Sequence, residues 1–462
     1  MQKTNKPFGW ADKIGYAFGD IANNFTFNFV AGFLMLFYTD VWGIDPKVVG
    51  GLFLTSRIVD AFTDVGMGRI VDKFKGNKDG KFRPFIKWGA IPVAFAGFLL
   101  FQTGLKDMSM TFKLVYMYAS YIFWGSICYT FINIPYGSMA SAVTADPDQR
   151  TELSTFRTLG ATIAGLTIGF ITPMLLFKAN PAGGEDILLM GRFPLVAGAY
   201  GILAVVSYMI CFTGVKERIK LNNFKVAEDL PKTKGIGHVL LNRSLISVIV
   251  MAILLLMAML LVGSMNAYIF RVYFQNGKGM ALAGLFAQLP MLITAPTAMK
   301  LGQKWGKKEA STFGFLFSAA VYILLFILKV KNMYVFLVGT SFAYFGLGIF
   351  NTLTWAMITD VIDDLEIKNG RRDDGTVYAI YSFARKLGQA LAGGLGGFAL
   401  TMVGYVSGAT TQTQEVAMGI YTVATLIPAI ALGVSGLVTW LIYPLDKKTV
   451  AKNVKILNEK RA

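Results

Sequence analysis

Charged residues in an otherwise apolar stretch are the groups most able to carry chemistry in this chain. Residues 47–71 are mostly apolar, yet they contain Arg57, Asp60 and Asp64, with Thr63 beside the second acid. At about 100° per residue these side chains share one sector of a helix. Two carboxylates one turn apart repel each other, which favours uptake of a proton or binding of a cation between them. The alternative is a structural ion-pair cluster that ties this helix to a neighbour.

Amide, hydroxyl and aromatic side chains form polar stripes on other apolar segments. Such groups suit a sugar, because amides and hydroxyls pair with its hydroxyls and a ring packs on its apolar face. The candidate substrate contacts are Asp20, Asn24, Asn133, Arg157, Asn351, Trp355, Lys386 and Gln389. Hydrogen bonds between packed helices are the alternative for each residue taken alone. Among these residues, Arg157 has the strongest need for an ion-pair partner or a function, because a cation in so apolar a segment is costly to bury.

Long apolar helices must position these residues. The chain has 462 residues, of which 54% are hydrophobic and only 15% are charged, whereas soluble proteins are about 25% charged. Apolar runs of about 20 residues recur along it, long enough to cross a hydrocarbon layer of about 30 Å. We therefore expect an all-α membrane protein of about twelve helices. The expected spans are residues 13–39, 47–71, 85–105, 112–139, 151–177, 191–213, 245–274, 280–303, 310–329, 333–360, 376–406 and 415–443.

Lys and Arg gather on one side of the expected membrane. The net charge of +17 could indicate a nucleic-acid partner, but the distribution of the charge decides otherwise. When every second connection is taken as cytoplasmic, about 30 Lys and Arg lie on that side and about 9 on the other. We expect a multi-pass protein of the cell inner (cytoplasmic) membrane, embedded in the lipid bilayer with both termini cytoplasmic and with no nucleic-acid partner.

A polar and strongly basic stretch divides the spans into two halves. The predicted organisation is an N-terminal bundle of about six helices at 1–213, a cytoplasmic linker at 214–244, a matching C-terminal bundle at 245–443 and a basic cytoplasmic tail at 444–462. Short, basic, glycine-bearing turns after the second and eighth spans form a weak repeat. Parallel repetition of a six-helix half with a central substrate site is typical of the major facilitator fold.

Sequence motifs give no indication of an enzyme. No Walker loop, HExxH or GxSxG lies in a soluble domain. Cys128 and Cys211, with the single His238, cannot make a typical zinc site or disulfide framework. We expect no catalytic residues and no cofactor, only a coupling ion that is either a proton or sodium.

Three segments carry a resemblance to a known family of transporters. They are residues 38–85, which begin YTDVWGID, then NIPYGSM at 133–139 and SFARKLGQALAGGLGG at 382–397. With them the chain closely resembles the glycoside-pentoside-hexuronide (GPH):cation symporter family of the major facilitator superfamily, relatives of melibiose permease. The resemblance covers nearly the whole chain. It implies the major facilitator fold, sugar uptake, and coupling to sodium, lithium or a proton.

The same resemblance implies a cation site. It assigns the coupling ion to Asp60 and Asp64, which would be the metal ligands if the ion is sodium, with Thr130 and Lys386 close by. Thr63 stands where melibiose permease has an asparagine. A sodium ion needs several oxygen ligands at once, whereas a proton needs one suitable carboxylate. The prediction therefore favours a proton over sodium.

The sugar contacts depart from melibiose permease. Asn24 and Asn133 stand where that protein has the two carboxylates that hold galactosides, while Arg157 is retained. Because amides in place of acids remove a repulsion, an acidic sugar such as a glucuronide becomes admissible beside Arg157 and Lys386. A neutral pentoside or glucoside is more common in the family.

The predicted function is symport of a small sugar or glycoside with a cation by alternating access. One alternative is a symporter of lysolipids or other amphiphiles with the same fold, which would need an apolar cleft open to the lipid. The polar stripes argue against it. A second alternative is a sugar sensor that no longer transports, which would bind sugar without flux.

The charge asymmetry predicts the topology directly. A cysteine introduced at Lys78 should react with an impermeant maleimide only from the cytoplasmic side, and one introduced at Gln412 only from outside. The measurement is labelling of whole cells against inverted vesicles. Labelling of the Lys78 position in whole cells would contradict the predicted orientation.

Overall fold

The computed structural model describes residues 7–144, 146–181, 185–219, 241–369, 374–409 and 411–461. Most of the predicted linker at 214–244 lies outside these residues. The described chain separates into two compact units.

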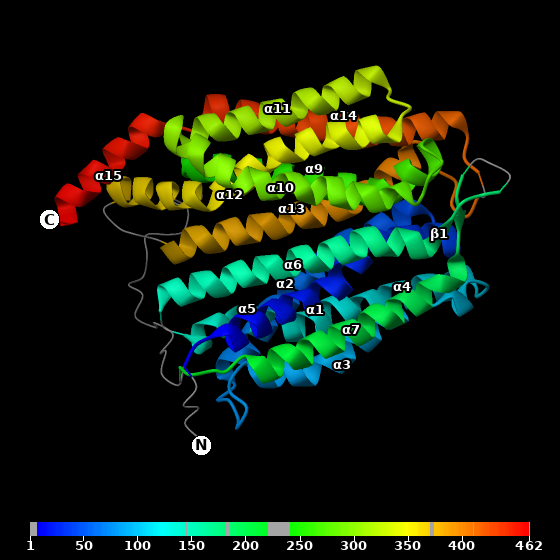
Figure 1. Ribbon diagram of the computed structural model, residues 1–462, viewed down its shortest axis with the longest axis horizontal. Coiled ribbons are helices and arrows are strands. Elements are labelled where there is room, and N and C mark those ends of the chain that lie inside the picture. Colours follow the sequence, from blue (N-terminus) through cyan, green and yellow to red (C-terminus); the bar gives the residue numbers. More distant parts are fainter. Residues whose placement is uncertain are drawn as a thin grey trace. The chain divides into compact units, whose positions relative to one another are not determined.

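Unit 1 is built from the first half of the chain. It comprises Met1–Glu228 with two later segments, Asn276–Ala281 and Tyr405–Thr411. Its helices are α1 (Trp10–Leu36), which continues as a π-helical turn η1 (Phe37–Val41), α2 (Pro46–Lys73), α3 (Arg83–Leu99), η2 (Thr103–Leu105), α4 (Met110–Ile122), η3 (Phe123–Tyr129), α5 (Thr130–Val143), α6 (Pro147–Leu176), η4 (Met190–Arg192) and α7 (Phe193–Gly214). A short antiparallel ladder, β1 (Phe177–Lys178) with β2 (Ile187–Leu188), joins α6 to α7. Helix α1 packs against α6 and α7, and α3 packs against α7 (Figure 1).

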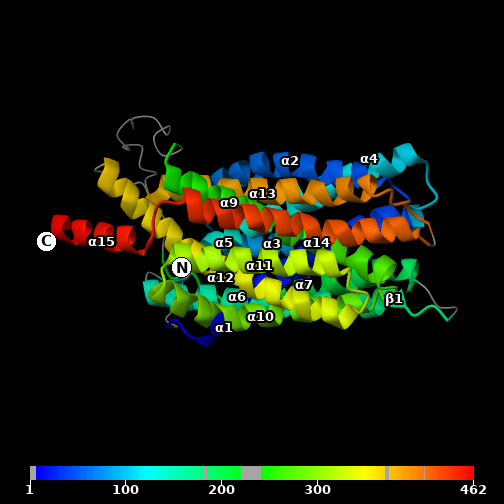
Figure 2. The ribbon, with the colours of Figure 1, turned by 90° about the horizontal axis from the view of Figure 1, so that it is seen from above.

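Unit 2 comprises Asp229–Gln275, Leu282–Gly404 and Gln412–Ala462. Its helices are α9 (Arg243–Tyr268) with η5 (Ile269–Tyr273), α10 (Gly279–Lys304), α11 (Lys307–Leu328), α12 (Met333–Asn369), α13 (Asp374–Met402), α14 (Gln414–Leu437) with η6 (Val438–Ile442), and α15 (Lys447–Arg461). Helix α11 packs against α12 and α14, while α9 packs against α13 and α14. Figure 2 shows α9, α13 and α14 running alongside one another.

The helices follow the predicted spans in order. Among the described residues, seven helices are long and apolar enough to cross a membrane. Helix α2, which carries Arg57, Asp60 and Asp64, is not among those seven. The all-α membrane fold is confirmed, with the two-residue ladder β1–β2 as a small addition.

The tail is a helix, which the sequence did not predict. Asp446 caps α15, because its Oδ1 accepts a hydrogen bond of 2.8 Å from the backbone N–H of Thr449. Hydrogen bonds from the side chain and the backbone of Thr449 hold the pKa of Asp446 below its ordinary value. Helix α15 packs on α12 and buries Asn453 and Leu457. The residues from 447 to 461 are therefore a docked helix with an outer basic face.

A segment from late in the chain is also held within unit 1. Tyr405 donates a hydrogen bond of 2.6 Å from its hydroxyl to Oδ1 of Asp40, and both residues are buried. Ser407 donates to the carbonyl oxygen of Ile44 at 2.9 Å. These contacts fasten Tyr405 and Ser407 to η1 and to the turn that follows it.

Helices α1 and α6 approach closely at a glycine. A Cβ added at Gly160 would clash with the backbone carbonyl of Ala17. Ala17 lies one turn before Asp20 on α1, and Gly160 lies one turn after Arg157 on α6. The missing side chain therefore lets the two helices come near enough for these charged residues to meet.

Gly160→Ala should separate α1 from α6. We expect the melting temperature to fall. An alanine inside a helix normally stabilises it by about 1 kcal/mol relative to glycine, so helix propensity alone would raise the melting temperature. Gly263→Ala is the matched control, because a Cβ there meets nothing within 4 Å. Thermal unfolding in detergent measures both variants. A Gly160→Ala protein at least as stable as the control would show that the close approach is not needed.

Candidate functional site

The predicted cation residues lie against a π-helical turn. Helix α4 does not continue regularly into α5, because η3 at Phe123–Tyr129 intervenes. A π turn inserts one residue into a helix and displaces the side chains and carbonyls around it. This turn lies beside α2.

Asp60 and Asp64 on α2 each accept a hydrogen bond from a hydroxyl group of this region. Ser126, within η3, donates a hydrogen bond of 2.5 Å to Oδ1 of Asp60. Arg57 donates to the other oxygen of Asp60 at 3.2 Å. Thr130, the first residue of α5, donates to Oδ1 of Asp64 at 3.0 Å and contacts the carbonyl of Gly125 at 3.3 Å. Carboxylate, hydroxyl and carbonyl oxygens thus converge between the two helices.

Thr63 and Lys386 are the other two predicted members of the cation site. Thr63 donates its hydroxyl to the backbone carbonyls of Val59 and Asp60, at 3.3 and 3.2 Å, within its own helix. Lys386 lies in α13, but its side chain is outside the described part of the structure. Ser126 and the Gly125 carbonyl were missed in the sequence, where the only signal was a hydroxyl residue four positions before Thr130.

A second polar cluster joins α1 to α6. The Nε of Arg157 lies 2.9 Å from Oδ1 of Asp20, whose side chain is only 7% exposed. Asn24 donates to the other oxygen of Asp20 at 2.9 Å. The structure brings these three predicted substrate residues together. Asp20 is the ion-pair partner that the sequence led us to expect for Arg157, although the Arg157 side chain is 43% exposed.

The ring of Tyr136 packs against the Arg157 guanidinium. The Arg157 carbon Cζ lies 5.5 Å from the centre of the Tyr136 ring, a cation–π distance. Tyr136 stacks on Tyr16 and donates its hydroxyl to the Tyr16 carbonyl at 2.7 Å. A side chain at Gly19 would collide with the Tyr136 ring. The Arg157 guanidinium therefore packs on the Tyr136 ring in addition to pairing with Asp20.

Asn133 lies between the two clusters along α5. It is half-buried, one turn after Thr130 and one turn before Tyr136. The same helical segment thus carries the hydroxyl that is bonded to Asp64, a predicted sugar contact and the ring that packs on Arg157.

Unit 2 carries its own aromatic and basic cluster. Arg385 lies with Cζ 5.8 Å from the Trp355 ring and 5.9 Å from the Tyr381 ring. Trp355 and Tyr381 meet edge to face at 5.4 Å, and the Tyr381 hydroxyl hydrogen-bonds Thr354 at 3.0 Å. Trp355 is 44% exposed. The ring of Trp355, a predicted sugar contact, therefore has the Arg385 guanidinium beside it.

The other predicted residues of unit 2 are half-buried. Asn351 lies one turn before Trp355 on α12, and Gln389 lies one turn after Arg385 on α13. They extend the polar surface of the cluster along both helices.

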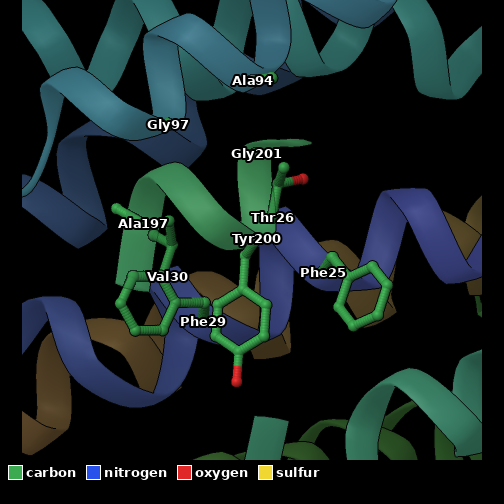
Figure 3. Close-up of a pocket in the computed structure, with 9 residues that line it drawn as sticks. All are labelled: Phe25, Thr26, Phe29, Val30, Ala94, Gly97, Ala197, Tyr200 and Gly201. Carbon is green, nitrogen blue, oxygen red and sulfur yellow. The ribbon is translucent and has the colours of Figure 1, made fainter. Parts of the chain in front are cut away.

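A small cavity between α1, α3 and α7 does not qualify as a sugar site. Its volume of about 10 Å³ is that of roughly one water molecule. Figure 3 shows its lining, which is mostly apolar: Phe25, Thr26, Phe29, Val30, Ala94, Gly97, Ala197, Tyr200 and Gly201. The polar clusters above remain the better candidates for binding.

Comparison with known proteins identifies the family. The family described as "MFS/sugar transport protein" matches residues 15–447. An uncharacterized symporter of Bacillus subtilis, YjmB, is 35% identical over 460 residues, which cover 99% of this chain and 97% of that protein. The chain belongs to the MFS/sugar transport protein family.

Other members of the family have more informative names. The glucuronide carrier protein homolog of Escherichia coli is 32% identical over 99% of this chain and 97% of its own length. The isoprimeverose transporter of Lactiplantibacillus pentosus is 31% identical over 95% of this chain and 89% of its own length. The predicted membership of the GPH symporter family is confirmed, and with it a transporter rather than an enzyme. Cation-coupled sugar symport is confirmed at the level of the family.

Solved structures agree on the fold. A bacterial homolog of the human lysosomal transporter Spinster superposes with a TM-score of 0.66 over 96% of this chain and 99% of its own, at 12% identity. The nucleoside transporter NupG gives 0.62 over 93% of this chain and 99% of its own, at 13% identity. The likeness to these transporters shows the major facilitator fold.

The Arg157 cluster yields a direct prediction. Arg157→Ala should abolish sugar binding, because it removes the guanidinium donors and leaves Asp20 as a buried, uncompensated carboxylate. Stabilisation by the coupling cation should survive, since the cation cluster keeps its residues. Isothermal titration and thermal shift measure the two effects on the same protein.

A second ion pair between the same helices provides the control. Lys13 of α1 and Glu152 of α6 lie 2.8 Å apart, with Glu152 48% exposed. Lys13→Ala removes a cation from the α1–α6 interface and should leave sugar affinity within about twofold of the native value, as exposed pairs contribute little. Unchanged sugar affinity in Arg157→Ala would falsify the assignment of this residue to the substrate.

Proposed function

We propose that this chain takes up a sugar or glycoside together with a proton, with Asp60 and Asp64 as the coupling groups. The observation that carries the proposal is the pair of acids on α2, each bonded to a hydroxyl from the η3–α5 segment. The two half-chains, 1–213 and 245–443, are the proposed moving bundles of an alternating-access cycle.

The donors around Asp60 and Asp64 bear on the choice of the coupling ion. Asp60 is bonded to Arg57 at 3.2 Å, and Asp64 accepts a hydrogen bond from Thr130 at 3.0 Å. A proton needs a single carboxylate and no cage of ligands, and the hydroxyl of Thr63 is already bonded within its own helix. A proton is therefore the coupling ion we favour, and sodium is the alternative that the experiment below distinguishes.

The energetics of such coupling are sufficient for accumulation. One positive charge that moves through a potential of about 100 mV releases about 2.3 kcal/mol. Since about 1.4 kcal/mol corresponds to a factor of ten, this supports a sugar gradient of about 50-fold before any ion gradient is added.

The proposed sugar contacts of unit 1 are Arg157, Asn24 and Asn133, and the predicted contact of unit 2 is Trp355. Relatives named for a glucuronide and for isoprimeverose support a sugar or glycoside as the substrate. The guanidinium of Arg157 is bonded to Asp20 through Nε and carries four further N–H donors, which suit paired hydroxyls or a carboxylate. Asp20 already balances its charge, which favours a neutral glycoside over an acidic one.

Two carboxylate variants test the coupling. Asp64→Asn and Asp60→Asn should each leave counterflow of labelled sugar largely intact in proteoliposomes, because the carrier can still exchange sugar without the ion step. Both should lose uphill uptake driven by an imposed proton gradient. Asp45→Asn, at the exposed start of α2 where an amide still caps the helix, is the control and should accumulate sugar normally.

Other outcomes decide between the alternatives. If sodium at constant pH raised sugar affinity severalfold in the native protein, and Asp64→Asn erased that rise, the coupling ion would be sodium. Sugar binding without counterflow would indicate a sensor, and counterflow only with amphiphiles would indicate a lysolipid carrier.

A further inference from the structure

One face of α11 exposes apolar side chains along most of its length. At about 100° per residue, these side chains fall within a sector of about 100°. Helix α11 is one of the seven helices long and apolar enough to cross a membrane. An exposed apolar face on such a helix is a surface for lipid. The exposed residues are Phe313, Leu316, Ile323, Leu324 and Ile327.

Trp305 extends this apolar face beyond the start of α11. It lies in the turn between α10 and α11, and its side chain is 43% exposed. Its ring meets Phe313 edge to face at 5.7 Å, and Phe313 stacks on Phe317 at 5.7 Å. An exposed tryptophan at the end of a membrane-spanning helix is typical of the layer where lipid headgroups meet water. The turn that contains Trp305 therefore marks the level of the headgroups.

Lysines from three helices surround this turn. Lys300 and Lys304 are exposed one turn apart at the end of α10, and Lys308 belongs to the first turn of α11. Lys447 and Lys448 begin α15. Nζ of Lys447 donates a hydrogen bond of 2.8 Å to the carbonyl oxygen of Lys304, which fastens the start of α15 to the end of α10 (Figure 1).

The glycine in the turn permits this approach. Gly306 has a φ of +120°, and a Cβ added there would lie 2.9 Å from the Cβ of Lys447. The lysines of α15 are therefore held against the same turn that presents Trp305.

The positive charge around the turn is only partly balanced. Residues 300–309 and 446–448 contain six lysines and two carboxylates. Lys307 is paired with Asp360 of α12 at 2.6 Å, which leaves five lysines against the two carboxylates. One of these carboxylates, Asp446, interacts with Lys308 and Lys448. The surface therefore carries an excess of positive charge, which suits an anionic headgroup.

We propose that the α10–α11 turn, the start of α15 and the apolar face of α11 together bind an anionic phospholipid. The phosphate of the headgroup lies among Lys304, Lys308 and Lys448, and an acyl chain lies along Phe313 and Leu316. The lysines and the apolar face are continuous through Trp305, and a soluble anion would leave that face unused. The inference is independent of the sugar and of the coupling ion.

The experiment is native mass spectrometry of the full-length protein in a neutral detergent. It measures the affinity for phosphatidylglycerol and for phosphatidylcholine with the same acyl chains. The test variant is Lys304→Gln/Lys308→Gln/Lys448→Gln, and Trp305→Ala tests the apolar part of the site. The matched control is Lys106→Gln/Lys329→Gln/Lys331→Gln, which removes the same number of charges from exposed lysines at other helix ends.

The native protein should bind phosphatidylglycerol at least about tenfold more tightly than phosphatidylcholine, because each lysine near the headgroup adds attraction. The triple test variant should lose this preference and keep its affinity for phosphatidylcholine. The control should keep the native preference within about twofold, since the attraction falls off within a Debye length. Trp305→Ala should weaken the binding of both lipids, because it removes a contact that does not depend on charge.

Sugar counterflow in each variant reports whether the protein is folded. If the triple test variant fails to fold, Lys304→Gln, Lys308→Gln and Lys448→Gln are measured singly, each with an expected loss of phosphatidylglycerol affinity of about fivefold.

Three results would overturn the inference. The first is equal affinity of the native protein for the two lipids. The second is an equal loss of phosphatidylglycerol affinity in the test variant and in the control, which would indicate the general charge of the protein. The third is displacement of phosphatidylglycerol by an equal concentration of glycerol 3-phosphate, which would indicate a site for a soluble anion.

Discussion

The free-energy cost of placing a charged side chain in hydrocarbon explains how the charged residues of this structure are paired. An ionised group inside a bilayer costs at least about 2.5 kcal/mol even on lenient scales, so it persists only with a partner or a function. In the described residues Arg157 meets Asp20, Arg57 meets Asp60, and Lys307 meets Asp360. The first and third pairs join different helices and hold their bundles together. On α2 Asp60 is bonded to Arg57 and to Ser126, and Asp64 accepts a hydrogen bond from Thr130.

Both polar clusters of unit 1 depend on the same two helical segments. Helix α1 carries Asp20 and Asn24 and, one turn later, Phe27, whose ring lies 5.8 Å from the Arg57 guanidinium and stacks on Tyr129 at 5.6 Å. The η3–α5 segment carries Ser126 and Thr130, which are bonded to Asp60 and Asp64, and Tyr136, whose ring packs on Arg157. A shift of either segment would move both clusters. In the proposed function, that shared framework couples the ion to the sugar.

Much of this arrangement follows from the sequence, and the remainder has identifiable causes. Hydropathy predicted the long helices, and helical periodicity placed Asp60 and Asp64 on one face, because both depend only on neighbours along the chain. The pairing of Arg157 with Asp20 depends on the approach of α1 and α6 at Gly160, which periodicity does not encode. The hydrogen bond of Ser126 to Asp60 depends on η3, and one inserted residue leaves the apolar pattern on either side unchanged. The helical tail escaped prediction because its composition is that of a solvated basic segment, and its cap at Asp446 and its buried Leu457 are visible only once it is folded.

Sugar-induced proton movement tests the central claim most directly. Purified protein in de-energised proteoliposomes would be exposed to a transported sugar while the pH of a weakly buffered external medium is recorded. The account predicts that the medium becomes alkaline as sugar enters, with a constant ratio of protons to sugar molecules and no requirement for sodium. Entry of the sugar without a pH change, or only when sodium is present, would contradict it.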